Sequence, residues 1–110
     1  MRFLSVYQAP EHITSPTEEE KIVMGRFIEQ GMKSGVLLAT EGCMPTAHGA
    51  RIRLSGGKLT TIDGPFAESK EVIAGFALLQ AASKEEALAY VTEFLNVVGG
   101  GQCELRQLYG

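Results

Sequence analysis

Two short apolar runs constrain the fold of this chain more than any other feature of its sequence. Val36–Glu41 is a short apolar run bordered by glycine residues, and Ile73–Ala81 is nearly continuous in apolar residues. Neighbouring side chains of a strand point to opposite faces of a sheet, so such runs predict strands that are apolar on both faces. We therefore expect a sheet with both faces covered and with Ile73–Ala81 near its centre.

A polar segment with helix-start signals precedes the first of these runs. Ser15 is the expected N-cap, Pro16 the first helical residue and Glu18 the residue that closes a capping box. We expect this helix to run to about Ser34, because Gly35 fits a left-handed terminator. Its predicted core stripe contains Met24, Phe27, Ile28 and Met32.

The C-terminal half of the chain repeats this pattern of strand and helix. Ser83 and Glu86 predict the start of a second helix, and the glycine run 99–101 ends it. A first strand is expected at residues 2–8 and a last strand at 102–108, where Cys103 and Leu105 share a face. The predicted core face of the second helix contains Ala87, Leu88, Val91, Phe94, Leu95 and Val98.

Between the two apolar runs, alternating residues on both sides of Gly56 and Gly57 predict a two-residue β-hairpin. A register that starts with Ser55 opposite Lys58 fixes all the other pairs. One face then carries the pairs Leu54–Leu59, Ile52–Thr61 and Ala50–Asp63, and the other carries Arg51, Arg53, Lys58 and Thr60.

This order of elements predicts a single α+β domain over residues 1–110. It matches a ferredoxin-like split βαβ sandwich with an extra β-hairpin, in which both helices cover one face of the sheet. The strands are nevertheless apolar on both faces, and a bare second face would be an apolar patch of several hundred Å², which is unusual on a soluble monomer. We therefore expect a homodimer that packs sheet face to sheet face.

Composition and charge exclude several functions. Ten Lys and Arg stand against thirteen Asp and Glu in 110 residues, which argues against nucleic-acid binding through phosphates. The best apolar run, 73–82, has about half of the ~20 residues that a membrane helix needs. The N-terminal residues do not resemble a signal peptide, and two cysteines without a CxxC spacing indicate free thiols. We expect a cytoplasmic location.

Asp63 is the first candidate for chemistry. At the head of a Gly-Pro turn it either bonds its own backbone or acts as a general base. The hairpin register makes His48 its diagonal neighbour, with backbones about 7–8 Å apart. A His next to an Asp is the minimal unit of general base catalysis, so we consider His48 and Asp63 a candidate catalytic pair beside the alternative of a solvated histidine.

Four further residues are candidates for binding a ligand: Tyr7, Arg51, Pro65 and Phe66. Pro65 fixes the turn that holds Asp63, Tyr7 ends the first strand, and Arg51 either clamps an anionic ligand or lies in solvent. Cys43 is either a nucleophile activated by His48 or an inert thiol. The cysteines and histidines lack the spacing of a zinc site, so we expect no metal. The sequence contains no cofactor signature, so we expect no cofactor.

The segment Asp63–Glu71, followed by Ile73–Phe76, resembles the signature of the DGPF family within the YCII-related superfamily. The likeness extends over the chain, through Gly35–Gly42, Ala50–Arg53 and Glu104–Arg106. It implies a ferredoxin-like domain that pairs as a dimeric α/β barrel, and it implies no settled activity. Some members resemble partners of extracytoplasmic-function sigma factors. Relatives with a His–Asp pair carry the histidine in the first helix, which has none here.

Two hypotheses follow from the sequence. The first is a small-molecule cleft with acid–base chemistry by Asp63 and His48, which requires converging polar groups in a concave site. The second is a non-enzymatic interaction module that assists a sigma factor or another regulator. Such a module requires an exposed apolar patch that remains after dimerisation.

Overall fold

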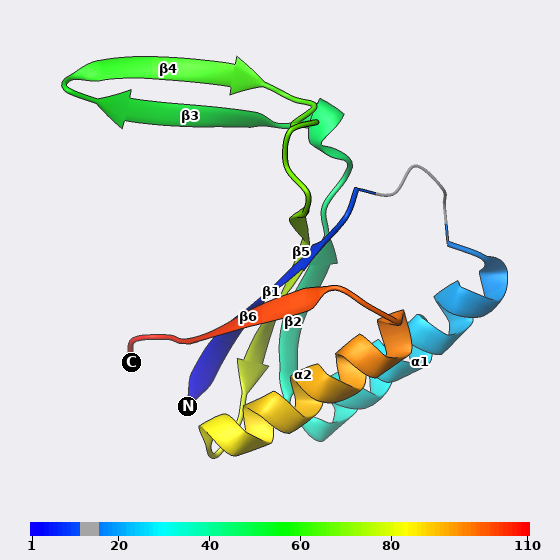
Figure 1. Ribbon diagram of the computed structural model, residues 1–110. Coiled ribbons are helices and arrows are strands. Elements are labelled where there is room, and N and C mark those ends of the chain that lie inside the picture. Colours follow the sequence, from blue (N-terminus) through cyan, green and yellow to red (C-terminus); the bar gives the residue numbers. More distant parts are fainter. Residues whose placement is uncertain (12–15) are drawn as a thin grey trace.

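A computed structural model describes residues 1–11 and 16–110 of the chain and contains two helices and six strands (Figure 1). In chain order, the elements are β1 (Arg2–Ala9), α1 (Glu18–Ser34), β2 (Leu37–Gly42), a 3-10 turn (Thr46–His48), β3 (Ala50–Ser55), β4 (Lys58–Asp63), β5 (Val72–Gln80), α2 (Lys84–Val98) and β6 (Gln102–Gln107).

Four strands form one sheet in the order β2-β5-β1-β6, and every neighbouring pair is antiparallel. The expected central position of β5 is confirmed, since β5 pairs with β1 on one side and with β2 on the other. This order, with one helix after β1 and another after β5, is that of a ferredoxin-like α+β fold. Strands β3 and β4 form a separate two-stranded sheet.

The core lies between the four-stranded sheet and the two helices. Phe3 of β1 and Leu79 of β5 are paired in the sheet and are 1% and 0% exposed. Ala87 and Val91 of α2 pack against them, together with Ile28 of α1. The strand expected at residues 2–8 is confirmed, and its odd-numbered side chains point toward the helices.

Helix α1 begins two residues later than the capping signals predicted. Thr17 is the N-cap, and its side chain accepts a hydrogen bond from the Glu20 backbone while the Glu20 carboxylate accepts one from the Thr17 backbone. Ser15, the predicted cap, lies outside the described residues, and the prediction was wrong because a Thr with Glu three residues later forms the same box. Gly35 ends the helix at φ 85°, as predicted.

The helix faces that pack on the sheet are narrower than predicted. Met32, Leu88 and Val98 were assigned to the core but are 48%, 43% and 38% exposed. Gly31 is buried in place of Met32, and a Cβ on it would collide with the hydroxyl of Tyr90. The prediction counted apolar residues, whereas close approach of the two helices selected the glycine on α1.

On the opposite face of the sheet, no helix of the described residues covers the strands (Figure 1). The register places two apolar pairs on this open face, Leu4 with Leu78 and Val6 with Phe76. Charged residues of β6 stand beside them, Arg106 next to Leu4 and Glu104 next to Val6. An apolar centre with a charged rim is the composition of a protein interface.

The β3–β4 hairpin has the predicted register at all six pairs, from Ala50 opposite Asp63 to Ser55 opposite Lys58. Figure 1 shows that it stands clear of the four-stranded sheet and of both helices. Every residue of both strands is exposed. The alternation of apolar and polar residues therefore predicted the pairing correctly, although residues 1–11 and 16–110 cover neither face of the hairpin.

Neither helix of the described chain is long and apolar enough to span a membrane. Within residues 1–11 and 16–110, no three His, Cys, Asp or Glu side chains gather in a way that could hold a metal ion. His12, one of the residues considered for zinc, lies outside this range.

Candidate functional site

A cavity of about 190 Å³ lies between the helices and the β2–β5 side of the sheet. Its walls are mainly apolar and aromatic, and its polar groups are mostly hydroxyls. The lining includes Ser5, Tyr7, Phe27, Thr40, Tyr90 and Phe94. Small residues of β5, Ala74, Gly75 and Ala77, leave space at the floor. A concave apolar site with a few polar groups is the usual form of a small-molecule pocket.

Aromatic rings fix the shape of this cavity. The rings of Phe27 and Tyr90 stack, with centroids 4.9 Å apart, and join α1 to α2. Tyr7 meets Phe94 edge to face at 5.1 Å. Because these rings brace one another across three elements, the cavity has walls that are formed before any ligand enters.

Tyr90 is the unusual group in this wall. Its hydroxyl oxygen is buried and has no hydrogen-bond partner within the described part of the chain. Burial raises the pKa of its phenol, and the charge of Glu93 adds to the increase. A buried hydroxyl without a partner costs about 1–3 kcal/mol, so a native fold that retains one offers a donor to something else.

The other hydroxyls have partners. Tyr7 donates to the carbonyl oxygen of Gly100 over 2.8 Å, and Thr40 donates to that of Phe76 over 2.8 Å. Burial also raises the pKa of Tyr7, with smaller contributions from Cys103 and Glu71. Tyr7 is therefore held in place in the wall, and Tyr90 differs from it because its hydroxyl has no partner among the described residues.

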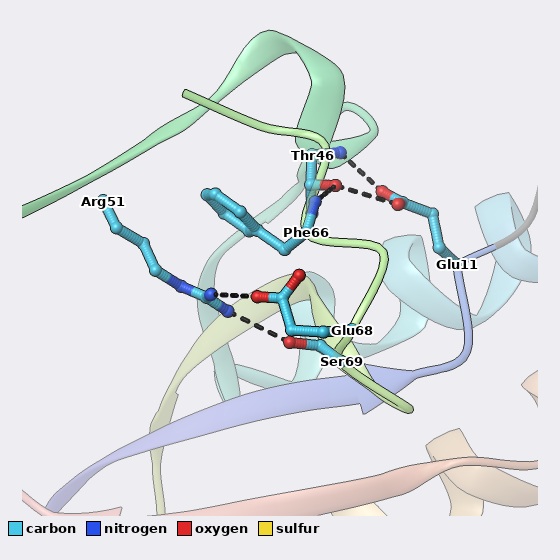
Figure 2. A network of polar contacts seen from close by, with 6 residues as sticks. All are labelled: Glu11, Thr46, Arg51, Phe66, Glu68 and Ser69. Atoms are coloured by element: carbon cyan, nitrogen blue, oxygen red, sulfur yellow. Dashed lines mark hydrogen bonds and ion pairs between the residues drawn. The ribbon is translucent and has the colours of Figure 1, made fainter. Parts of the chain in front are cut away.

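A second cluster of contacts lies at the base of the hairpin (Figure 2). The guanidinium of Arg51 donates to the Glu68 carboxylate over 2.9 Å and to the Ser69 hydroxyl over 3.2 Å. It also lies 3.9 Å from the centroid of the Phe66 ring. A hydrogen bond from its own backbone, followed by the bond from Arg51, lowers the pKa of the Glu68 carboxyl. Arg51 is thus engaged by the protein itself.

Thr46 connects this cluster to the end of β1. Its backbone N–H and its hydroxyl both donate to the Glu11 carboxylate, and the hydroxyl accepts from the Phe66 backbone over 3.0 Å. The backbone of Gly64 donates to the carbonyl oxygen of Gly49 over 2.9 Å. The Asp63–Phe66 turn therefore fastens the hairpin base to the loop that follows β2, and the Gly64–Pro65 bond within it is cis.

Gly64 is required by this close approach. A Cβ at this position would collide with the backbone carbonyl of Thr46. The collision involves backbone atoms, which cannot turn aside as a flexible side chain can. The glycine of the Asp-Gly-Pro-Phe segment thus has a structural reason, separate from any role in chemistry.

The six residues predicted from the sequence do not form one site. Tyr7 lines the cavity, whereas Arg51 and Phe66 meet at the hairpin base, next to the exposed Pro65. Asp63 and His48 are both exposed, and neither lines the cavity. No hydrogen bond or ion pair joins these two described residues. Their catalytic pairing stays a prediction.

The two thiols differ in environment. Cys103 is half-buried on the helix side of β6, and burial raises its pKa while a hydrogen bond with Ser5 opposes the increase. Cys43 is exposed at the end of β2. The burial of Cys103 makes it the less reactive thiol.

Fold and cavity together define a small α+β domain with a ferredoxin-like sheet, a lipophilic space beneath the helices and a projecting hairpin. Comparison with known proteins identifies the family of this domain. Residues 1–105 match the YCII-related domain, and the chain belongs to that family. It is 33% identical over 97 residues to the uncharacterized protein R00369 of Rhizobium meliloti (strain 1021), a match that covers 86% of this chain and 78% of that protein.

The sequence did not predict the roles of Tyr90 in the cavity wall or of Glu11 and Thr46 at the base of the hairpin. Tyr90 lies four residues before Phe94 and three after Ala87, so its spacing on the core face was a usable signal. Glu11 and Thr46 carried no such signal, because a contact across 35 residues between two loop positions leaves no local pattern.

Proposed function

We propose that this member of the YCII-related family is a small-molecule-binding domain whose ligand occupies the cavity beneath the helices. One observation carries the proposal: the buried, unpartnered hydroxyl of Tyr90 in the wall of a preformed apolar cavity. A ligand that accepts a hydrogen bond there removes the cost of the unpaired donor and buries its own apolar surface.

The size and lining of the cavity define the ligand class. An apolar cavity of about 150 Å³ in a protein interior binds benzene, and the cavity here measures about 190 Å³. Its lining offers hydroxyl donors, the carboxylate of the exposed Glu41 and no Lys or Arg, so an anionic ligand would find no counter-charge. The best fit is a neutral compound of one ring with a hydrogen-bond acceptor.

Phenol and toluene test this proposal because they have nearly the same shape and differ in one polar atom. Titration of ¹⁵N-labelled protein should give saturable shifts in residues that line the cavity. In Tyr90→Phe, phenol should bind about 2- to 13-fold more weakly, since a net hydrogen bond contributes about 0.5–1.5 kcal/mol. Toluene should bind equally well to both proteins.

Tyr109→Phe is the matched control, because that tyrosine is fully exposed. It should leave both affinities unchanged. Absence of saturable shifts with either compound, up to millimolar concentration, would contradict ligand binding in this cavity.

We propose further that two copies pair through the open sheet face in the cytoplasm, in the manner of a dimeric α/β barrel. Leu4, Val6, Phe76 and Leu78 supply the apolar centre of that face. Val6→Lys would place a charge at this centre and should convert a dimer into a folded monomer in sedimentation velocity. An unchanged sedimentation coefficient for Val6→Lys would contradict the pairing.

Acid–base catalysis by Asp63, with His48 as its partner, remains part of the proposal for a member of the DGPF branch. Both residues are exposed and neither lines the cavity, so we propose this chemistry for the base of the hairpin and not for the cavity. The variants His48→Ala and Asp63→Asn test this catalytic role through ligand affinity and turnover. Unchanged values in both variants would contradict it.

The exposed apolar side chains of the hairpin favour a second candidate function, an interaction module that binds a regulator such as a sigma factor. Ile52, Leu54 and Leu59 are 73%, 67% and 68% exposed. Co-sedimentation with a purified sigma factor, compared between the natural chain and Leu54→Ser, would test this function.

A further inference from the structure

The β3–β4 hairpin is an arm with an uncovered apolar face. The register places Ile52, Leu54 and Leu59 together on one face, and each side chain is at least 67% exposed. An isolated two-stranded hairpin is at best marginally stable in water. The arm therefore needs another surface to cover it.

The arm also makes the single chain unusually extended. The radius of gyration is 15.8 Å, whereas a compact chain of this length has about 13 Å. The excess fits a hairpin that stands away from the body, as Figure 1 shows. The polar cluster at its base fastens it in this direction through Arg51, Gly64 and Thr46. The arm is thus both exposed and anchored.

We propose that each arm lays its apolar face on a second copy of this chain and so completes the dimer that the open sheet begins. This inference rests on the proposed sheet-to-sheet pairing and adds the hairpin to its interface. It assigns Ile52, Leu54 and Leu59 to the contact and leaves the opposite face of the arm, with Arg53 and Lys58, in solvent.

The area of the open face supports a second copy as the occupant. The strands of the sheet have six to nine residues, which at about 3.3 Å per residue and 4.8 Å per strand gives a face of roughly 500 Å². A stable interface buries about 800 Å² per partner. The sheet alone therefore falls short of a stable dimer.

The two arms of a dimer add the buried area that the sheet lacks. One face of a hairpin with six-residue strands covers roughly 200 Å². In a two-fold dimer, each copy buries its own arm and the surface under its partner's arm, because the same patches meet twice. The sum is about 900 Å² per partner, near the size of a standard interface.

A triple variant tests the arm directly. Ile52→Ser, Leu54→Ser and Leu59→Ser together should raise the dissociation constant of the dimer at least tenfold in analytical ultracentrifugation. The monomer should stay folded, with an unchanged urea midpoint when both proteins are dilute enough to be monomeric, because these side chains are exposed in the single chain. The matched control is Arg53→Ser, Lys58→Ser and Thr60→Ser on the opposite face, which should dimerise like the natural chain.

Hydrogen exchange supplies a second measurement on the natural chain. Amides of residues 50–63 should exchange more slowly at protein concentrations above the dissociation constant than below it. Exchange at the same rate in both conditions, or a triple variant that dimerises as tightly as the natural chain, would overturn the role of the arm.

The outcomes separate this inference from the dimer on which it rests. If Val6→Lys abolishes dimerisation and the triple variant does not weaken it, the sheet pairing stands and the arm has another partner. If the natural chain is monomeric at all concentrations tested, both proposals are wrong.

Discussion

The body of the protein and its hairpin contain strands with similar alternation, yet they end in opposite environments. Phe3 and Leu79 in the body are almost fully buried, whereas Leu54 and Leu59 in the hairpin are about two-thirds exposed. Each pair lies directly across two neighbouring strands. The alternation of apolar and polar residues thus determines which side chains face each other across a strand pair. The connection of that pair to the rest of the chain determines what covers them.

The largest expected effect comes from truncating one leucine in each region. Leu79→Ala should lower the free energy of unfolding by about 2–5 kcal/mol, since it leaves a cavity in the core. Leu59→Ala should change it by less than about 0.5 kcal/mol when the protein is dilute enough to be monomeric. Urea denaturation of both variants measures the difference, and equal losses would mean that the hairpin is packed within its own chain.

Gly64→Ala should produce the next largest effect, at the joint between the regions. The new methyl group collides with the Thr46 carbonyl, and relief requires the backbone to shift at a cost of about 1–3 kcal/mol. Hydrogen exchange should accelerate at residues 46–66 and stay unchanged in β1 and β5. Gly100→Ala, where a Cβ meets no atom within 4 Å, is the control and should leave exchange unaltered.

Two tyrosine variants should shift stability in opposite directions inside the body. Tyr90→Phe removes an unpartnered donor and should raise stability by up to about 1 kcal/mol, whereas Tyr7→Phe removes the bond to Gly100 and should lower it by about 0.5–1.5 kcal/mol. Thermal unfolding without added ligand measures both. A loss of stability in Tyr90→Phe would show that its hydroxyl already has a partner.

The smallest effect concerns thiol chemistry and leaves stability unchanged. Cys43, exposed where β2 leads toward the hairpin, should react with iodoacetamide before Cys103. The raised pKa of Cys103 keeps its thiolate fraction low at pH 8. Mass spectrometry of tryptic peptides over time gives the order, and faster modification of Cys103 would indicate that β6 opens readily.

Much of the body could be predicted because its signals are local. The apolar run 73–81, the glycine after Ser34 and the serine before Lys84 each describe their own surroundings. The N-cap was predicted at Ser15 because two overlapping capping boxes fit the sequence, Ser15 with Glu18 and Thr17 with Glu20. The observed geometry shows that the second one is formed. The register of the hairpin was correct at every pair, since two glycines permit one tight turn.

The site was harder to predict because it depends on distant parts of the chain. The cavity exists where small residues of β5 face aromatic rings from both helices, and such a space has no signature in any single segment. The Asp-Gly-Pro-Phe motif made Asp63 a candidate for chemistry, and the structure shows that the neighbouring Gly64 has a packing role. Arg51 was foreseen as solvated or ligand-binding, and it is held by Glu68 and Phe66.

The fastening of the arm has a consequence for how the protein responds to ionic strength. Arg51 and Glu68 are 49% and 70% exposed, so dissolved ions screen their attraction. Sulfate or phosphate strengthens apolar burial at the same time. Rising concentrations of such salts should thus weaken the Arg51–Glu68 contact at the base of the arm and strengthen the burial of its apolar face, two opposed responses within residues 50–68.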